Sequence, residues 1–158
     1  MKYVLEDLLR IRLLREEKAE RELLIRRQEL DKARKLLLER EEELAHYRQW
    51  RPPEEERLFK NIQNRIVKSE DIENLRLQIA LLRGKEIALE GAVEEAKKQL
   101  REAQWLFDEA TNSYREALQG RQKIEEHRKV WRLEEKRKDE AMSDKELEEF
   151  SSNSKVDL

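Results

Sequence analysis

The chain has 158 residues, of which 46% are charged, with a formal net charge of −2, three glycines and two prolines. This composition is typical of a long helix and excludes a compact globular domain with a large apolar core. There is no cysteine, so neither a disulfide framework nor a thiolate metal site can form. The apolar runs are only a few residues long, so we expect no membrane span, no signal peptide and a cytoplasmic protein.

The first helix is expected from about residue 3 to about residue 67. Pro52 and Pro53 lack backbone donors and restrict the residue before them, which predicts a break at 51–53. The helical pattern resumes after the prolines, with three glutamates in the first turn. We therefore interpret the prolines as a kink and not as the turn of a hairpin, because a turn there would leave half of the second helix uncovered.

The chain reversal is predicted at 68–70. Ser69 can cap a second helix whose first turn carries Glu70 and Asp71, where the helix dipole favours acidic side chains. This second helix is expected to extend over about 70–145.

The second helix carries a long apolar seam with a repeat of 3.5 residues, which predicts a partner helix and a left-handed supercoil. Only Glu86, Arg121 and Arg128 interrupt it. The seam consists of Ile72, Leu75, Ile79, Leu82, Leu89, Val93, Ala96, Leu100, Ala103, Phe107, Ala110, Tyr114, Ala117, Ile124 and Trp131.

Leucines in the first helix match alanines in the second. Facing residues have numbers that add to 140, which places the midpoint of the hairpin at residue 70 and lets large side chains fill the space left by small ones. The matched pairs are Leu23 with Ala117, Leu30 with Ala110, Leu37 with Ala103 and Leu44 with Ala96. We therefore predict an all-α fold, a monomeric antiparallel two-helix coiled-coil hairpin over residues 1–150, followed by a flexible tail at 151–158.

Two glycines, Gly84 and Gly91, lie inside the expected second helix, where each costs about 1 kcal/mol relative to alanine. The sequence leaves two explanations open. The glycines either allow close approach of the two backbones opposite the kink or are simply tolerated.

The sequence offers nothing for catalysis. A two-helix hairpin has no pocket that excludes water, and its three glycines are too isolated to form a phosphate-binding loop. His46 and His127 lie far apart in the predicted hairpin and cannot share a metal. We expect no enzyme activity, no cofactor and no metal.

Nucleic-acid binding is also disfavoured. Residues 1–51 contain 14 basic and 12 acidic side chains that alternate along the helix, so phosphates would be repelled nearly as often as attracted.

A basic cluster is expected where the two ends of the hairpin meet. It is either a solvated surface or a contact for an acidic protein partner. Trp131, in the same place, either packs against Leu5 and Leu9 or anchors a partner. The cations of the cluster are Arg10, Arg12, Arg15, Arg128, Lys129 and Arg132.

Two short stretches at this end resemble a known family. They are residues 3–12, with the sequence YVLEDLLRIR, and residues 127–131, with the sequence HRKVW. Both are similar to the type III secretion stalk proteins of the YscO family and their flagellar counterpart FliJ. The resemblance implies an antiparallel hairpin like the central shaft of rotary ATPases, which inserts into a hexameric secretion ATPase, promotes its assembly or activity and reaches toward the export gate. Some members also bind export chaperones.

This resemblance makes the basic cluster, with Trp131, the predicted partner-binding site of a cytoplasmic protein peripheral to the membrane-embedded secretion apparatus. Two other readings stay open. The hairpin could be an adaptor that binds chaperones or clients without acting on an ATPase, or the chain could form a parallel self-dimer that serves as a spacer.

Overall fold

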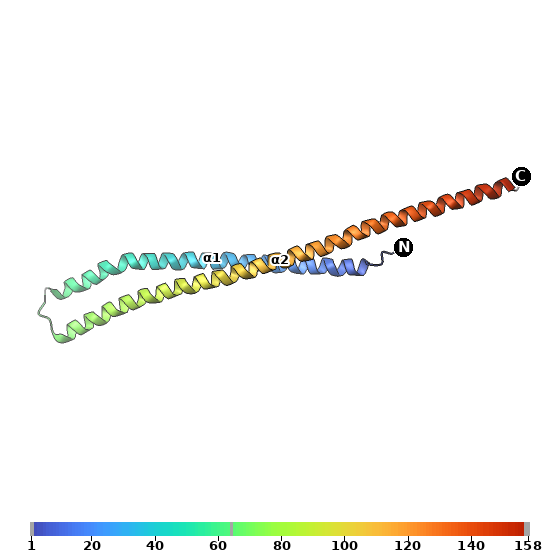
Figure 1. The fold of residues 1–158 in the computed structure, drawn as a ribbon. Helices are drawn as coiled ribbons and strands as arrows, with labels where there is room; N and C mark the ends of the chain where they lie inside the picture. The colour runs from blue at the N-terminus through green and yellow to red at the C-terminus, as the bar shows by residue number, and fades with distance from the viewer. Residues whose placement is uncertain (1, 64, 157–158) are drawn as a thin grey trace. The chain divides into compact units, whose positions relative to one another are not determined.

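The computed structural model describes residues 2–63 and 65–156, and the side chains as far as residue 154. Two helices account for nearly all of this part of the chain: α1, Glu6–Gln63, and α2, Ser69–Val156. A short loop joins them (Figure 1). The prediction of an all-α helical hairpin is confirmed.

Helix α1 begins where Tyr3 and Leu5 supply the first carbonyl acceptors. Tyr3 O accepts a hydrogen bond from the Glu6 N–H at 3.1 Å, and Leu5 O accepts one from the Leu9 N–H at 2.9 Å. The first turn carries Glu6 and Asp7, as the helix dipole favours.

The predicted break at 51–53 is not present, because α1 continues through Pro52 and Pro53 as one helix. Each proline removes an N–H that would bond to the carbonyl four residues earlier, on Arg48 or Gln49. Both prolines and both of these residues are exposed. Water can therefore solvate the two carbonyls, which makes the prolines tolerable inside the helix.

The loop lies earlier in the chain than predicted. Helix α1 ends at Gln63, not near residue 67, and α2 begins at Ser69. Lys68 takes the capping position that was assigned to Ser69: the Asp71 carboxylate accepts a hydrogen bond from the Lys68 N–H at 3.2 Å, and Lys68 O accepts one from the Asp71 N–H at 3.1 Å. The first bond is one half of a capping box, in which the acidic side chain at the third helical position accepts from the N–H of the cap residue, and the second is a backbone bond of the first turn.

Helix α2 does not end near residue 145. It continues to Val156, so residues 151–156, which were expected to form a flexible tail, are helical.

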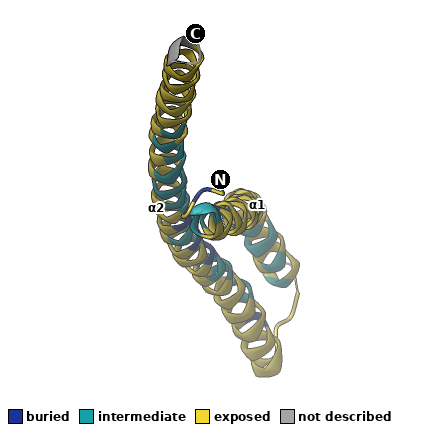
Figure 2. Ribbon diagram, turned by 90° about the vertical axis from the view of Figure 1, so that its right-hand side faces the viewer, coloured by how far each residue is buried: buried dark blue, intermediate teal, exposed yellow. Residues whose placement is uncertain are grey.

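The hairpin divides into two compact units. The terminal unit contains Met1–Leu23 and Ala110–Leu158, and the apical unit contains Leu24–Glu109. Figure 2 shows that buried and half-buried residues follow the helices where they are paired, while the last turns of α2 are exposed.

Five of the eight leucines and alanines in the predicted pattern are buried, and Leu23, Leu37 and Ala117 are half-buried. Leu44, Ala96 and Ala103 in the apical unit are 8%, 2% and 9% exposed, and Leu30 and Ala110 are equally well buried. The predicted register is nevertheless displaced. The contacts between the helices join residues whose numbers add to between 129 and 138, not 140. The earlier end of α1 explains the shift, because the loop between Gln63 and Ser69 is centred at residue 66 and not at residue 70.

Candidate functional site

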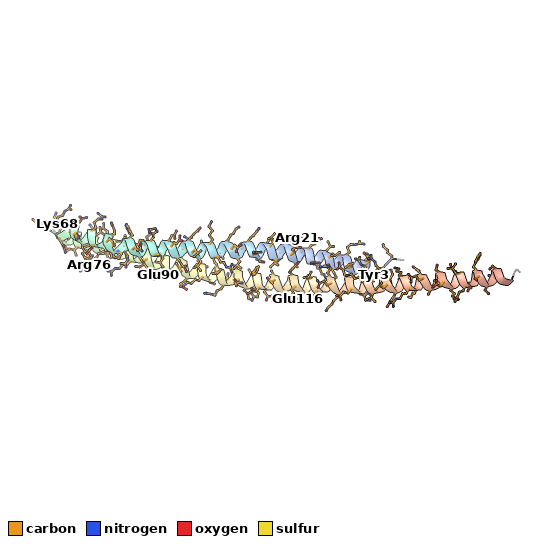
Figure 3. The ribbon with its side chains drawn as sticks, turned by 90° about the horizontal axis from the view of Figure 1, so that it is seen from above. Tyr3, Arg21, Lys68, Arg76, Glu90 and Glu116 are labelled. Atoms are coloured by element: carbon orange, nitrogen blue, oxygen red, sulfur yellow. The ribbon has the colours of Figure 1, made fainter. Side chains whose placement is uncertain are left out.

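The start of the chain is fixed against α2 by aromatic contacts in the terminal unit. Tyr3 is 6% exposed, and its hydroxyl lies 2.5 Å from Nδ1 of His127. The Tyr3 ring also packs on Trp131, with 5.1 Å between ring centroids and 55° between the planes. Figure 3 shows Tyr3 beside α2, which continues past it without a second helix. The two stretches that resemble the YscO family therefore meet at Tyr3.

Sequence reasoning did not find this aromatic cluster. The predicted register offered Leu5 and Leu9, and not Tyr3, as the neighbours of Trp131. The signal that could have found it was Tyr3 itself, a large aromatic residue directly before the helix, because such a residue normally needs something to cover it.

Two of the three charges that interrupt the seam are paired across the helices in this unit. Arg128 Nη1 lies 3.3 Å from Glu6 Oε1. Arg121 bonds to both carboxylate oxygens of Glu16, and its Nη1 donates to Glu125 at 2.7 Å. The hydrogen bond to Glu16 raises the pKa of Arg121 further above its ordinary value, so the guanidinium stays charged at every accessible pH. Both arginines hold the hairpin together.

Arg12 also lies between the helices. A Cβ placed on Gly120 would lie 3.0 Å from Arg12 Nη1, so the absent side chain of Gly120 makes room for the Arg12 guanidinium to cross α2. Arg12 Nε is buried and makes no hydrogen bond. The Arg12 side chain therefore packs against α2 at Gly120.

The structure thus divides the predicted partner-binding set into two groups. Arg12 and Arg128 contribute to contacts between α1 and α2, and Trp131 packs on Tyr3, which lies just before α1. The exposed cations, which carry charge at the surface of the terminal unit, are Arg10, Arg15, Lys129 and Arg132. Arg10 forms an ion pair with Asp7 at 3.3 Å, and both side chains are exposed.

The third seam charge, Glu86, lies at the centre of an ion-pair network in the apical unit. Glu86 Oε1 lies 3.1 Å from Arg48 Nε, and Glu86 Oε2 lies 2.8 Å from Arg51 Nε. The Arg51 contact is short enough for an ion pair, but the Arg51 Nε–H does not point at the carboxylate and makes no hydrogen bond. Arg51 and Arg83 in turn bind Glu55, at 2.9 Å and 3.4 Å. The network therefore links the two helices on both sides of the prolines.

The charge state of Glu55 follows from this network. Burial alone would raise the pKa of the Glu55 carboxyl, but the hydrogen bonds from Arg51 and Arg83 outweigh it and lower the pKa below its ordinary value. Glu55 is therefore ionised at neutral pH.

A shallow open groove lies beside this network. It surrounds Tyr47, whose ring packs on Trp50 at 5.6 Å between centroids and lies under Lys85, with Nζ at 5.3 Å. The groove has no enclosed volume from which water is excluded and no nucleophile next to a base, so it offers no catalytic arrangement. Its remaining lining residues are Glu43, His46 and Leu89.

Two further features of the described residues limit the chemistry. No cluster of three or more metal-binding side chains is found among them. None of their helices is apolar enough along its length to cross a membrane.

Comparisons with known proteins agree with the fold. The family model of the type III secretion protein YscO matches residues 5–153. The YscO structure from Vibrio parahaemolyticus is 28% identical, covers 92% of each chain and has a TM-score of 0.84. A putative YscO homolog from Chlamydia trachomatis, CT670, is 20% identical, covers 96% of this chain and 93% of its own, and has a TM-score of 0.76, a likeness that concerns the fold alone. A search of curated proteins found no match. Because the family model spans nearly the whole chain, the protein belongs to the YscO family of type III secretion proteins.

Proposed function

We propose that this protein is the central stalk of a hexameric type III secretion ATPase, which it enters with its terminal unit, promoting assembly or activity of the ring and linking it to the export gate. The observation that carries this proposal is that residues 3–12 and 127–131, the two stretches that resemble the YscO family, pack against each other and form one surface. Tyr3 joins them through His127 and Trp131. The cations of both helices are thereby held at the same end of the hairpin.

The surface charge of this end suits a protein partner with acidic loops. Arg15, Lys129 and Arg132 are exposed and make no ion pair within the described residues. Exposed cations contribute little to the stability of a helix, so they are available for electrostatic contacts that guide association.

The terminal unit is asymmetric, and this asymmetry is how a stalk could act on a ring of identical subunits. Helix α1 begins at Glu6, and α2 alone continues beyond Trp131 to Val156. An asymmetric shaft cannot contact six identical subunits in the same way. Its contacts differ in energy between ring states, and such differential binding is what shifts a conformational equilibrium.

The test is the rate of ATP hydrolysis by the purified cognate ATPase with and without this protein. The triple variant Arg15→Glu, Lys129→Glu, Arg132→Glu should abolish stimulation while leaving the helical circular dichroism intact. A matched variant with three exposed cations of the apical unit reversed, Arg27→Glu, Lys32→Glu and Lys35→Glu, should stimulate like the wild type.

Stimulation should also weaken as salt rises, because the Debye length falls to about 10 Å at 0.1 M. The opposite pattern contradicts the proposed orientation: full stimulation by the terminal triple variant and none by the apical variant would mean that the apical unit, and not the terminal unit, meets the ATPase.

A second candidate is an adaptor that binds export chaperones or clients without acting on the ATPase. The groove beside Tyr47 and the exposed Trp50 and Trp105, 50% and 62% exposed, favour it, because exposed aromatic side chains are frequent anchors in interfaces. An adaptor binds a chaperone in pull-down with purified components but leaves the ATPase rate unchanged. A stalk changes the rate with no chaperone present.

A further inference from the structure

One face of α2 in the apical unit carries large apolar side chains that none of the described residues covers. Leu77, Leu81 and Ile87 are 61%, 73% and 68% exposed. They lie around Gly84 and Gly91, and a Cβ added to either glycine would meet no atom within 4 Å. The glycines therefore do not serve close approach to α1, which was one of the two explanations that the sequence left open.

The spacing of this face indicates what it binds. Leu77, Leu81, Gly84, Ala88 and Gly91 follow one another in alternating steps of four and three residues. A repeat of 3.5 residues on a helix matches a second helix. The glycines and alanines at its centre would let the two backbones approach closely, while the large side chains pack on either side.

We propose that this outer stripe binds the same stripe of a second copy of the chain, with the two α2 helices antiparallel about a two-fold axis at Gly84. In this arrangement Leu77 faces Gly91, and Leu81 faces Ile87. Large side chains thus fill space left by small ones or pack on each other, and each contact occurs twice, as a two-fold interface requires. The outer stripe consists of Leu77, Ala80, Leu81, Gly84, Ile87, Ala88 and Gly91.

Charges beyond the stripe favour this antiparallel pairing over a parallel one. The same axis places Glu70 opposite Lys98, and both are exposed. A parallel pairing would place Glu70 on Glu70 and Lys98 on Lys98, which is repulsive. Glu73 and Glu95 are a like-charged pair in the antiparallel arrangement, but a parallel pairing would also place like charges on each other at both positions, so this pair does not favour a parallel pairing.

The expected dimer is weak. The stripe covers about four helical turns, which places the interface at the small end of specific contacts and its dissociation constant in the micromolar to millimolar range. The chain is then monomeric in dilute solution, in agreement with the expectation from its sequence, and pairs only where its local concentration is high.

Sedimentation equilibrium of the full chain over this concentration range tests the pairing. The wild-type mass should rise toward that of a dimer, whereas Gly84→Glu should stay monomeric. Gly84→Glu should fold, because a side chain there points into open space and glycine is the weaker helix former. Gln28→Glu, at an exposed position of α1, should dimerise like the wild type.

Two further variants test the direction and register. Mixing a Leu77→Cys chain with a Gly91→Cys chain under mild oxidation should give the mixed disulfide in preference to either self-linked product, since the chain has no other cysteine. Glu95→Lys should tighten the dimer by placing a cation opposite Glu73. The proposal is overturned if the wild type is monomeric at millimolar concentration, or if Leu77→Cys links preferentially to itself. The outer stripe would then bind a helix of another protein.

Discussion

The hydroxyl of Tyr47 on α1 donates a hydrogen bond of 2.5 Å to the backbone carbonyl of Leu82 on α2. Tyr47 is 7% exposed, so this bond lies in the interior of the apical unit, one turn before the two prolines. Together with the Glu86 network it ties the helices to each other beside the point where α1 loses two backbone hydrogen bonds.

Replacing Tyr47 with phenylalanine should lower the free energy of unfolding by about 0.5–1.5 kcal/mol, the usual net contribution of one hydrogen bond. Burial of the phenol raises the pKa of Tyr47 above its ordinary value of 10.0. The folded state therefore holds this proton to a higher pH than the unfolded state, so stability is present below pH 10 and is lost as the pH rises through the folded pKa. Urea unfolding at about pH 9 and about pH 11 should show a smaller decline in Tyr47→Phe than in the wild type. Tyr114→Phe, which leaves Tyr47 in place, should show the wild-type decline.

Replacing Glu86 with alanine should destabilise the apical unit by about 1–2 kcal/mol, because Arg51, with its side chain 20% exposed, would lose a partner on the other helix. Glu43→Ala removes an exposed contact within one helix, to Arg40 at 3.2 Å, and should change the free energy of unfolding by less than about 0.5 kcal/mol. Guanidinium unfolding of both variants measures the difference. Equal effects would show that the Glu86 network adds nothing beyond an ordinary surface ion pair.

Enlarging Ala96 to leucine should destabilise the hairpin by about 1–3 kcal/mol, because Ala96 is 2% exposed and its neighbours leave no space for three more carbons. The control is Ala45→Leu, at an exposed position of α1, which should be nearly neutral. Thermal unfolding followed by circular dichroism compares the two. A neutral Ala96→Leu variant would contradict the tight packing of the seam.

Exchanging the charges of Arg121 and Glu16 tests the cross-helix pair of the terminal unit. Arg121→Glu alone should lower the melting temperature, because it places a third carboxylate beside Glu16 and Glu125. Adding Glu16→Arg should recover much of the loss, since opposite charges again face each other across the helices. Failure of the double variant to melt above the single one would mean that Arg121 acts through its packing and not through its charge.

Much of the fold follows from the sequence because a coiled coil is specified by local periodicity. The 3.5-residue repeat, the small residues Ala96 and Ala103 and the charged composition predicted two long helices folded back on each other, and the likeness to the YscO family was visible in residues 3–12 and 127–131. The same pattern identified Glu86, Arg121 and Arg128 as interruptions of the seam.

The tertiary structure alone decided what those interruptions do and which cations are free. Each seam charge finds its partner on the other helix, and the partner depends on the register, which the position of the loop shifts by several residues. A heptad pattern repeats every seven residues and tolerates such shifts, whereas an ion pair depends on the reach of a single side chain. For the same reason only the structure could separate Arg12 and Arg128, which hold the helices together, from the exposed cations that form the proposed contact with the ATPase.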